Sequence, residues 1–166
     1  MAASEADLGR SPVALTINGR RTVLDAAPGE RLLDALRRAG WLDIKESCGE
    51  GECGSCTVLL DGRAVCSCLL LAQSAEGADV VTAAATGHRV VGALRRAFVE
   101  EMGTQCGFCT PGMVLAAADL LTGDGDPDEA KIRRALAGNL CRCTGYHRIL
   151  RAVQRAAAEL REEVQP

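Results

Sequence analysis

Aromatic residues are scarce in this chain of 166 residues, which has two phenylalanines, one tryptophan and one tyrosine. Few large side chains are therefore available to stack on bases, and the formal net charge of -3 offers no excess of lysine and arginine to hold phosphates. The two histidines, His88 and His147, stand alone in the sequence. We expect no nucleic-acid partner, and we expect both histidines to be surface or packing residues rather than metal ligands.

Long apolar runs are also absent. No stretch approaches the ~20 continuous apolar residues of a membrane span. Residues 1–11 lack the apolar segment of a secretory signal, and the apolar run after Arg20 and Arg21 is too short for a twin-arginine export signal. We therefore expect no membrane span and a cytoplasmic location. In the cytoplasm thiols stay reduced, so cysteines bind metals more often than they form disulfides.

Cysteine, in contrast, is abundant, and eight of the nine cysteines form two sets of four. The first set, which has C-x4-C-x2-C spacing and a fourth cysteine twelve positions on, is Cys48, Cys53, Cys56 and Cys68. This is the spacing of a plant-type [2Fe-2S] site, whereas a zinc ribbon would pair two C-x2-C knuckles. Interleaved glycines allow the backbone to close around the sulfurs and to direct N–H groups at them. The first set therefore predicts a [2Fe-2S] cluster, with zinc as the alternative.

The second set pairs C-x2-C with C-x-C about thirty residues later, and consists of Cys106, Cys109, Cys141 and Cys143. This spacing also fits zinc. Cys109 and Cys143, however, directly precede predicted helix starts at Thr110 and Thr144, and helix N-termini favour negatively charged groups. We favour a second [2Fe-2S] cluster over zinc. Two clusters in one small chain, with no visible pairing of a nucleophile and a general base, indicate electron transfer.

Strand and turn patterns dominate the first half of the chain. Asn18-Gly19 and Asp61-Gly62 are favourable two-residue turns, each flanked by apolar or alternating residues, so we expect two hairpins. The expected strands are residues 13–17, 20–24, 57–60, 63–67 and 79–82, the expected helix is 31–39 with Gly40 as its end, and the cysteine-rich segment 46–56 is an expected loop. These elements predict a small sheet with one helix, forming a domain over residues 12–83.

Helical periodicity dominates the second half. The expected helices are residues 90–102, 111–121, 128–137 and 146–162, with Gly138 ending the third and Thr144 capping the fourth. Short links favour an up-down-up-down bundle, which gathers both cysteine pairs of the second set at one end. The prediction is thus an α+β protein with a second domain over residues 88–162 and with disordered ends at 1–11 and 163–166.

Four motifs carry a resemblance to a known family. They are C-G-E-G-E-C-G-S-C-T-V at 48–58, S-C-L at 67–69, Q-C-G-F-C-T-P-G-M at 105–113 and G-N-L-C-R-C-T-G-Y at 138–146. In this order they closely resemble the small iron-sulfur subunit of the molybdenum hydroxylases, the family of xanthine dehydrogenase, aldehyde oxidoreductase and aerobic carbon monoxide dehydrogenase. The resemblance implies a β-grasp ferredoxin-type domain followed by a four-helix bundle, each holding one [2Fe-2S] cluster.

The resemblance also implies partners. In the family, electrons leave a molybdopterin centre on a large subunit, pass the bundle cluster and the ferredoxin cluster, and reach FAD on a medium subunit, and a dimer of heterotrimers is the implied assembly. By position, Gln105 and Cys143 match family residues that approach the pterin, and residues 49–51 match the loop that faces the flavin. Nothing in this chain could bind molybdopterin or FAD by itself, so substrate oxidation is expected on the partners.

The ninth cysteine, Cys66, tests the ligand assignment. Cys66 and Cys68 would share one face of a continuous strand, so the period of a strand alone does not distinguish them. The family resemblance selects Cys68 and implies that Cys66 is a small buried strand residue. Arg142, between two expected ligands, either offsets cluster charge, contacts a partner, or is a solvated loop residue.

The substrate of the complex is the least determined feature. The wording C-G-E-G-E-C-G resembles purine and N-heteroaromatic hydroxylases more than carbon monoxide dehydrogenase, which favours a xanthine-type enzyme. Two other functions are open alternatives. One is a free-standing two-cluster ferredoxin that serves a separate reductase or oxygenase, and the other is a zinc-stapled interaction scaffold.

Overall fold

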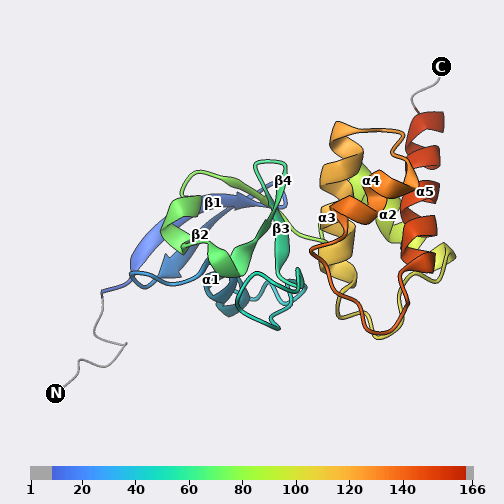
Figure 1. Ribbon diagram of the computed structural model, residues 1–166. Coiled ribbons are helices and arrows are strands. Elements are labelled where there is room, and N and C mark those ends of the chain that lie inside the picture. The colour runs from blue at the N-terminus through green and yellow to red at the C-terminus, as the bar shows by residue number, and fades with distance from the viewer. Residues whose placement is uncertain (1–8, 164–166) are drawn as a thin grey trace.

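The computed structural model describes residues 9–163 (Figure 1). The strands are β1 (Ser11–Ile17), β2 (Arg20–Ala26), β3 (Thr57–Leu60), β4 (Arg63–Cys66) and β5 (Asp79–Val81). The α-helices are α1 (Leu32–Arg38), α2 (Arg89–Glu100), α3 (Thr110–Gly123), α4 (Glu129–Ala135) and α5 (His147–Glu162), and two short 3-10 helices are η2 (Ser67–Leu69) and η3 (Ala72–Ala75). We call residues 9–85 the sheet half and residues 86–163 the helical half.

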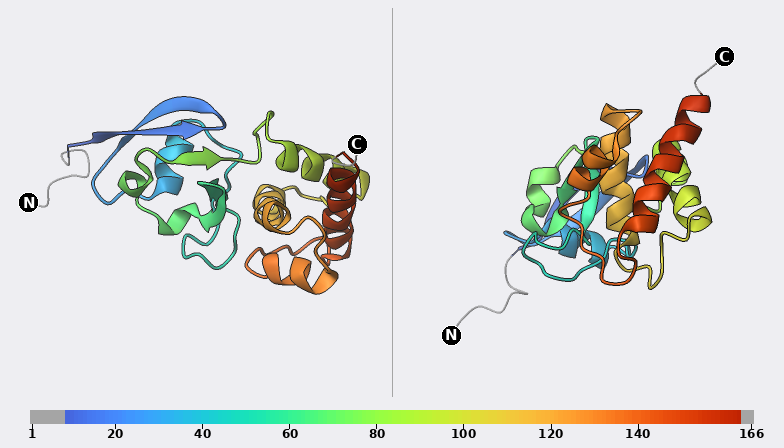
Figure 2. Two further views of the ribbon diagram at one scale, coloured as in Figure 1. Left: turned by 90° about the horizontal axis from the view of Figure 1, so that it is seen from above. Right: turned by 45° about the vertical axis from the view of Figure 1, so that its right-hand side comes forward.

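The sheet half is built from the two expected hairpins and the later strand β5. Both hairpin turns have left-handed φ at their two central residues, 51° and 79° at Asn18 and Gly19 and 49° and 82° at Asp61 and Gly62, as the right-handed twist of the strands favours. The strand order is β2-β1-β5-β3-β4, with β1 and β5 parallel and the other pairs antiparallel. Helix α1 packs against β2, η2 and η3 (Figure 2). Its leucines are buried in the core of this half.

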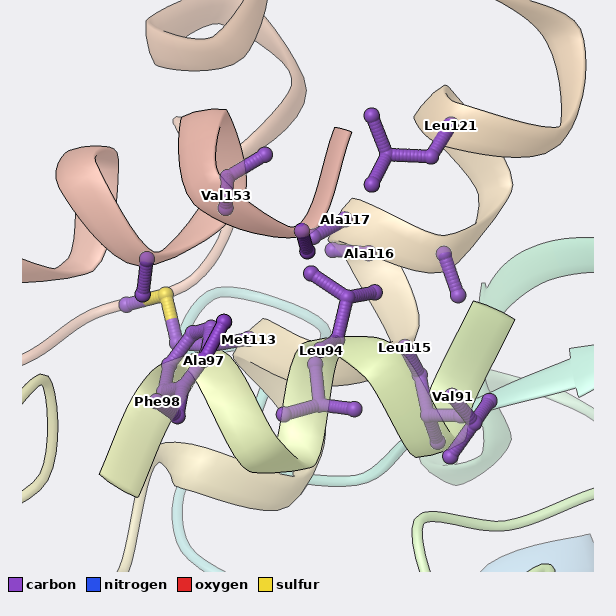
Figure 3. Close-up of a cluster of buried hydrophobic side chains, with 14 of the residues drawn as sticks. Val91, Leu94, Ala97, Phe98, Met113, Leu115, Ala116, Ala117, Leu121 and Val153 are labelled. Carbon is purple, nitrogen blue, oxygen red and sulfur yellow. The ribbon is translucent and has the colours of Figure 1, made fainter. Parts of the chain in front are cut away.

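The helical half places its apolar residues between four helices. Each helix packs against its neighbour in the sequence, and α2 also packs against α5, which closes the arrangement. Leu94 and Phe98 of α2 lie beside Met113 of α3 and near Val153 of α5 (Figure 3), and all four are buried. The loops α2–α3 and α4–α5 consequently emerge at the same end of the helices (Figure 1).

The two halves pack directly against each other. Helix α3 contacts β3 and β4, and Leu59 and Val81 of the sheet belong to the same buried cluster as the helical core. Asp119 of α3 adds a polar link, because its Oδ2 accepts a hydrogen bond of 3.1 Å from the backbone N of Ala64, and its Oδ1 lies 3.3 Å from Nε of Arg63.

Several expected boundaries were wrong. Ser11 begins β1 and Arg10 donates a hydrogen bond of 2.9 Å to the carbonyl of Asp25, so the N-terminal end of the fold starts earlier than expected. Helix α4 ends at Ala135, and Gly138 does not stop it, because the chain already leaves the helix through tight turns such as Asn139 N to Leu136 O at 2.9 Å.

At the opposite end Glu163, expected to be disordered, caps α5 and pairs with Arg89 at 3.3 Å. The rest of the ends that we expected to be disordered, residues 1–8 and 164–166, lie outside the described residues. Among the helices of residues 9–163, none is both long enough and apolar enough to cross a membrane.

Candidate metal centres

The first cysteine set is held by the loop between α1 and β3 and by η2. Its thiols belong to Cys48, Cys53, Cys56 and Cys68. The loop reverses its direction repeatedly, and it does so at glycines with left-handed φ, which are 71° at Gly49, 80° at Gly51 and 68° at Gly54. Ser67 ties η2 to this loop, because its N and Oγ donate hydrogen bonds of 3.3 and 2.7 Å to the carbonyl of Cys56. This places Cys68 beside Cys56.

The thiols of the first set interact pairwise. The thiol of Cys53 interacts with that of Cys48, and the thiol of Cys68 interacts with that of Cys56, with which Cys66 interacts as well. Within residues 9–163, no three His, Cys, Asp or Glu side chains are arranged to hold a single metal ion. A [2Fe-2S] cluster uses four thiolates, two on each iron, so two neighbouring pairs fit its ligand pattern.

Two thiols of the first set, those of Cys53 and Cys68, have opposite pKa shifts. Burial raises the pKa of Cys53, but hydrogen bonds from Ser55 and from the backbone and thiol of Cys48 outweigh burial and hold this pKa at about 6. Burial and the neighbouring Cys56 raise the pKa of Cys68 to about 12. The backbone N–H of Glu50 also points at the sulfur of Cys48, at 3.4 Å. Metal binding at this site therefore requires the release of protons, as thiolate ligation does in general.

Cys66 lies next to this set but is not equivalent to Cys68. Strand β4 ends at Cys66 and the chain then turns into η2, so the two residues do not share one face of a continuous strand. The expectation that the strand continues to Ser67 was therefore wrong, and with it the symmetry between the two cysteines. Cys66 is half-buried, and burial together with Cys56 raises its pKa to about 11.

The second cysteine set is formed by two loops that lie at one end of the helices. Its thiols belong to Cys106 and Cys109 in the α2–α3 loop and to Cys141 and Cys143 in the α4–α5 loop. The Sγ atoms of Cys143 and Cys106 are 3.6 Å apart, and the thiol of Cys109 contacts that of Cys141. The helical topology thus brings together two cysteine pairs that are about thirty residues apart in sequence, again as two sulfur pairs.

The electrostatics of the second set resemble those of the first. Burial and Cys141 raise the pKa of Cys109 to about 12. Burial also raises the pKa of Cys141, but hydrogen bonds from the hydroxyl of Thr144, 3.1 Å away, and from backbone amides outweigh it and lower this pKa. Cys106 raises the pKa of Cys143.

The start of α5 differs from the sequence prediction. Thr144 does not cap this helix, because its hydroxyl is bound to the sulfur of Cys141 and accepts the N–H of Tyr146 at 3.2 Å. The helix begins at His147, and Tyr146 precedes it with a left-handed φ of 67°. Cys109 does sit at the N-terminus of α3, as expected, but Cys143 lies several residues before α5 and does not adjoin a helix N-terminus.

Tyr146 is a functional residue that sequence reasoning missed. Its hydroxyl accepts a hydrogen bond of 2.8 Å from the N–H of Cys141 and donates one of 3.2 Å to the carbonyl of Asn139. The phenol thereby braces the loop that carries half of the second set. The single tyrosine of the chain, three residues after Cys143, was the available signal.

The remaining predicted residues lie on the surface. Gln105 and Arg142 are exposed, next to the exposed thiols of Cys106 and Cys143, and Phe108 adds an exposed aromatic ring, with 43% of its surface accessible, to this end of the molecule. His88 caps α2 by accepting the N–H of Val91 at 3.4 Å, which matches the expected packing role.

The two sites are close neighbours across the boundary between the halves. The backbone N–H of Leu140, next to Cys141, donates a hydrogen bond of 2.9 Å to the carbonyl of Cys53. The side chain of Asn139 donates to the carbonyl of Gly54 at 2.9 Å. Sequence reasoning missed Asn139 as well, because its partners are 82 and 85 residues away.

Comparisons with known proteins match both halves to iron-sulfur proteins. Residues 15–85 match the family described as a 2Fe-2S iron-sulfur cluster binding domain, and residues 81–154 match the [2Fe-2S] binding domain family. The nicotinate dehydrogenase small FeS subunit of Eubacterium barkeri is 41% identical over 153 residues, which cover 90% of this chain and 96% of that protein. The xanthine dehydrogenase iron-sulfur-binding subunit of Escherichia coli O157:H7 is 45% identical over 148 residues, which cover 85% and 91%.

The fold is likewise similar to a solved structure. The crystal structure of quinoline 2-oxidoreductase from Pseudomonas putida 86 contains a chain that is 38% identical, superimposes with a TM-score of 0.87, and covers 95% of this chain and 99% of its own length. The similarity therefore includes both cysteine sets and the boundary between the halves.

Proposed function

This chain belongs to the small [2Fe-2S] subunits of the molybdenum hydroxylases, in which it is an electron-transfer subunit, and we propose that it passes electrons from a molybdopterin centre on a large subunit to FAD on a medium subunit. The observation that carries the proposal is the presence of two sites of four cysteines each, which touch through the hydrogen bond from the N–H of Leu140 to the carbonyl of Cys53. A structural metal would need one such site.

The proposed ligands are the two complete sets. They are Cys48, Cys53, Cys56 and Cys68 for one [2Fe-2S] group and Cys106, Cys109, Cys141 and Cys143 for the other. When bound, each group takes up and releases one electron at a time. The chain supplies thiolates in pairs, N–H and O–H donors to the sulfurs, and glycines that let the first loop close around them.

Exposure suggests the direction of electron flow. Cys106 and Cys143 are the exposed thiols, and Gln105 lies next to them. We assign Gln105 and Cys143 to the approach of the partner's molybdopterin. The loop at residues 49–51, with Glu50 exposed, lies in the other site and is assigned to the contact with FAD. Electrons would then enter through the second set and leave through the first.

The division into two domains is part of the same proposal. We assign residues 12–83 to a β-grasp ferredoxin-type domain and residues 88–162 to a four-helix bundle. The strand order with one packed helix, the four helices and the two family matches support this division. A cytoplasmic location fits thiols that must remain reduced until they bind iron. A dimer of heterotrimers is the proposed assembly.

The names of the relatives point to a class of substrate. The similar proteins are parts of enzymes named for nicotinate, xanthine and quinoline, which are all nitrogen-containing aromatic rings. We propose that the complex hydroxylates a purine or another N-heteroaromatic compound, in an oxidation that takes its oxygen from water.

Purification of the tagged chain from its native host tests the proposal. We expect co-purification with molybdenum- and flavin-containing subunits, about four irons per chain, and two distinct EPR signals after anaerobic reduction with dithionite. Two EPR signals without any partner would instead support a free-standing ferredoxin. Zinc without a visible spectrum would support the interaction scaffold.

A further inference from the structure

One backbone hydrogen bond connects the two cysteine sets. The N–H of Leu140 donates to the carbonyl oxygen of Cys53 at 2.9 Å. Cys53 belongs to the first set, and Leu140 is bonded directly to Cys141 of the second. The covalent bonds of Cys53, Leu140 and Cys141, together with this hydrogen bond, therefore form a continuous path between Sγ atoms of the two sites.

The side chain of Asn139 fastens this contact. It is 6% exposed, and its Nδ2 donates hydrogen bonds of 2.9 Å to the carbonyl of Gly54 and 3.3 Å to the hydroxyl of Thr57. The backbone carbonyl of Asn139 accepts the hydroxyl of Tyr146 at 3.2 Å. Asn139 is thus held to the sheet half by its side chain and to the second site by its backbone, and it immediately precedes Leu140.

The contact is closely packed at two glycines. A Cβ atom on Gly54 would lie 2.5 Å from Nδ2 of Asn139 and 2.5 Å from the carbonyl oxygen of Gly138. A Cβ atom on Gly112 of α3 would overlap the carbonyl oxygen of Gly54. The backbones of Gly54, Gly112 and Gly138 therefore meet closely around the side-chain amide of Asn139, and this buried amide loses hydrogen bonds if its acceptors move away.

We propose that Asn139 is a positioning residue for electron transfer within the chain. It keeps the N–H of Leu140 on the carbonyl of Cys53 and so fixes the separation and the bonded path between the two sites. The two groups that the cysteine sets would hold would exchange one electron along this path, with no proton moved and no covalent bond broken. The inference rests on the proposed function only in requiring that both sites carry [2Fe-2S] groups.

A second link between the halves provides a control. Asp119 binds the N–H of Ala64 and the side chain of Arg63 on β4, and it touches neither cysteine loop. Asp119→Ala should loosen the boundary between the halves without breaking the contact of Leu140 with Cys53. Asn139→Asp has the same shape as the native residue but turns a carboxylate oxygen toward the carbonyl of Gly54.

The experiment compares the iron-loaded full chain, its Asn139→Asp variant and its Asp119→Ala variant. Iron content and visible circular dichroism report on the sites themselves. Hydrogen exchange of the peptide that contains Leu140 reports on the contact between Leu140 and Cys53. Two measurements report on the coupling of the two sites. They are the rate of electron transfer between the sites after flash reduction and the magnetic splitting of the EPR signals in the fully reduced protein.

We expect the Asn139→Asp variant to keep about four irons per chain. Its Leu140 amide should exchange about ten- to a hundredfold faster, because the buried carbonyl of Gly54 loses its donor. Electron transfer between the sites should be slower, and the splitting of the EPR signals should be smaller. Asp119→Ala should keep the native rate and splitting. A native transfer rate in Asn139→Asp, or an equal loss in Asp119→Ala, would overturn the inference.

If Asn139→Asp fails to bind iron, Thr57→Val replaces it. This variant keeps the shape of the side chain. It removes one acceptor of the Asn139 amide and the hydrogen bond of 2.7 Å that the Thr57 hydroxyl donates to the carbonyl of Gly54, but it leaves the hydrogen bond from Asn139 to Gly54, so exchange of Leu140 should rise and the transfer rate should fall, each by less. An unchanged exchange rate of Leu140 and an unchanged electron-transfer rate in Thr57→Val would refute the positioning role of Asn139. All of these measurements use the chain without its partners, so a failure of the proposed function, seen as absent partners, is distinct from a failure of this inference.

Discussion

The thiol of Cys66 faces the carbonyl oxygen of Gly51, with 3.8 Å between Sγ and O. Its thiol also interacts with the thiol of Cys56, as the thiol of Cys68 does. The two cysteines differ in their place in the fold, because Cys66 ends β4 and Cys68 lies in η2, and we expect Cys68 rather than Cys66 to be the ligand.

Replacing the two cysteines separately should give opposite results. Cys66→Ser should retain about four irons per chain, because serine can donate the same hydrogen bond, and Cys68→Ser should retain about two. Iron analysis and the two EPR signals measure the outcome. The ligand set is wrong if Cys66→Ser loses a cluster and Cys68→Ser does not.

Alkylation of the iron-loaded protein should depend on pH at Cys66. The pKa of this thiol is raised to about 11, so the reactive thiolate is scarce at lower pH and increases as the pH rises toward 11. With iodoacetamide at pH 8 we expect labelling roughly ten- to a hundredfold slower than that of a free cysteine. Mass spectrometry of digested protein measures the rate at each pH, and Cys66→Ser is the control that should show no labelling. Fast labelling of Cys66 near neutral pH would contradict the prediction.

Tyr146→Phe should weaken the second site. The variant leaves the N–H of Cys141 and the carbonyl of Asn139 without their partner, which costs about 1–3 kcal/mol for a partly buried group. We expect the second EPR signal to disappear faster during incubation with an iron chelator, while the first signal decays at its native rate. Equal decay of both signals in the variant and the native protein would show that the phenol does not support the site.

Two glycines on neighbouring helices should respond in opposite directions to alanine. At Gly112 a Cβ atom would meet the backbone of Gly54, so Gly112→Ala should lower the midpoint of urea unfolding. At Gly92 of α2 a Cβ atom would meet only the flexible end of Arg96, at 3.6 Å. Because alanine favours the helix, Gly92→Ala should raise the midpoint of urea unfolding and increase the free energy of unfolding by about 0.5–1 kcal/mol. The close backbone contact between the halves is disproved if both variants are equally stable.

Local patterns predicted most elements of this fold. The turn at Asn18-Gly19 and the start of α3 at Thr110-Pro111 were correct because both depend on the conformational preferences of the residues themselves. The sequence also indicated that the second cysteine set lies at one end of the helices, since that follows from short connections.

Features that depend on distant partners were not predictable in this way. Threonine is a residue type that often caps helices, but the hydroxyl of Thr144 is bound to the sulfur of Cys141, and α5 starts later, at His147. From the sequence alone, Asn139 is indistinguishable from any polar loop residue, because its hydrogen-bond acceptors belong to the sheet half. Strand β4 ends at Cys66 because Ser67 forms hydrogen bonds with the carbonyl of Cys56. The alternation of residues along a strand does not indicate such hydrogen bonds.

The link between Asp119 and Ala64 has a consequence for self-association. Strand β4 is an edge of the sheet, and its outward N–H groups would ordinarily be open to pairing with a strand of another molecule. The carboxylate of Asp119 accepts a hydrogen bond from the N–H of Ala64, and α3 lies against β4. The helical half therefore protects this edge, which leaves β2 as the free edge of the sheet and discourages the chain from aggregating through β4 before it meets its partners.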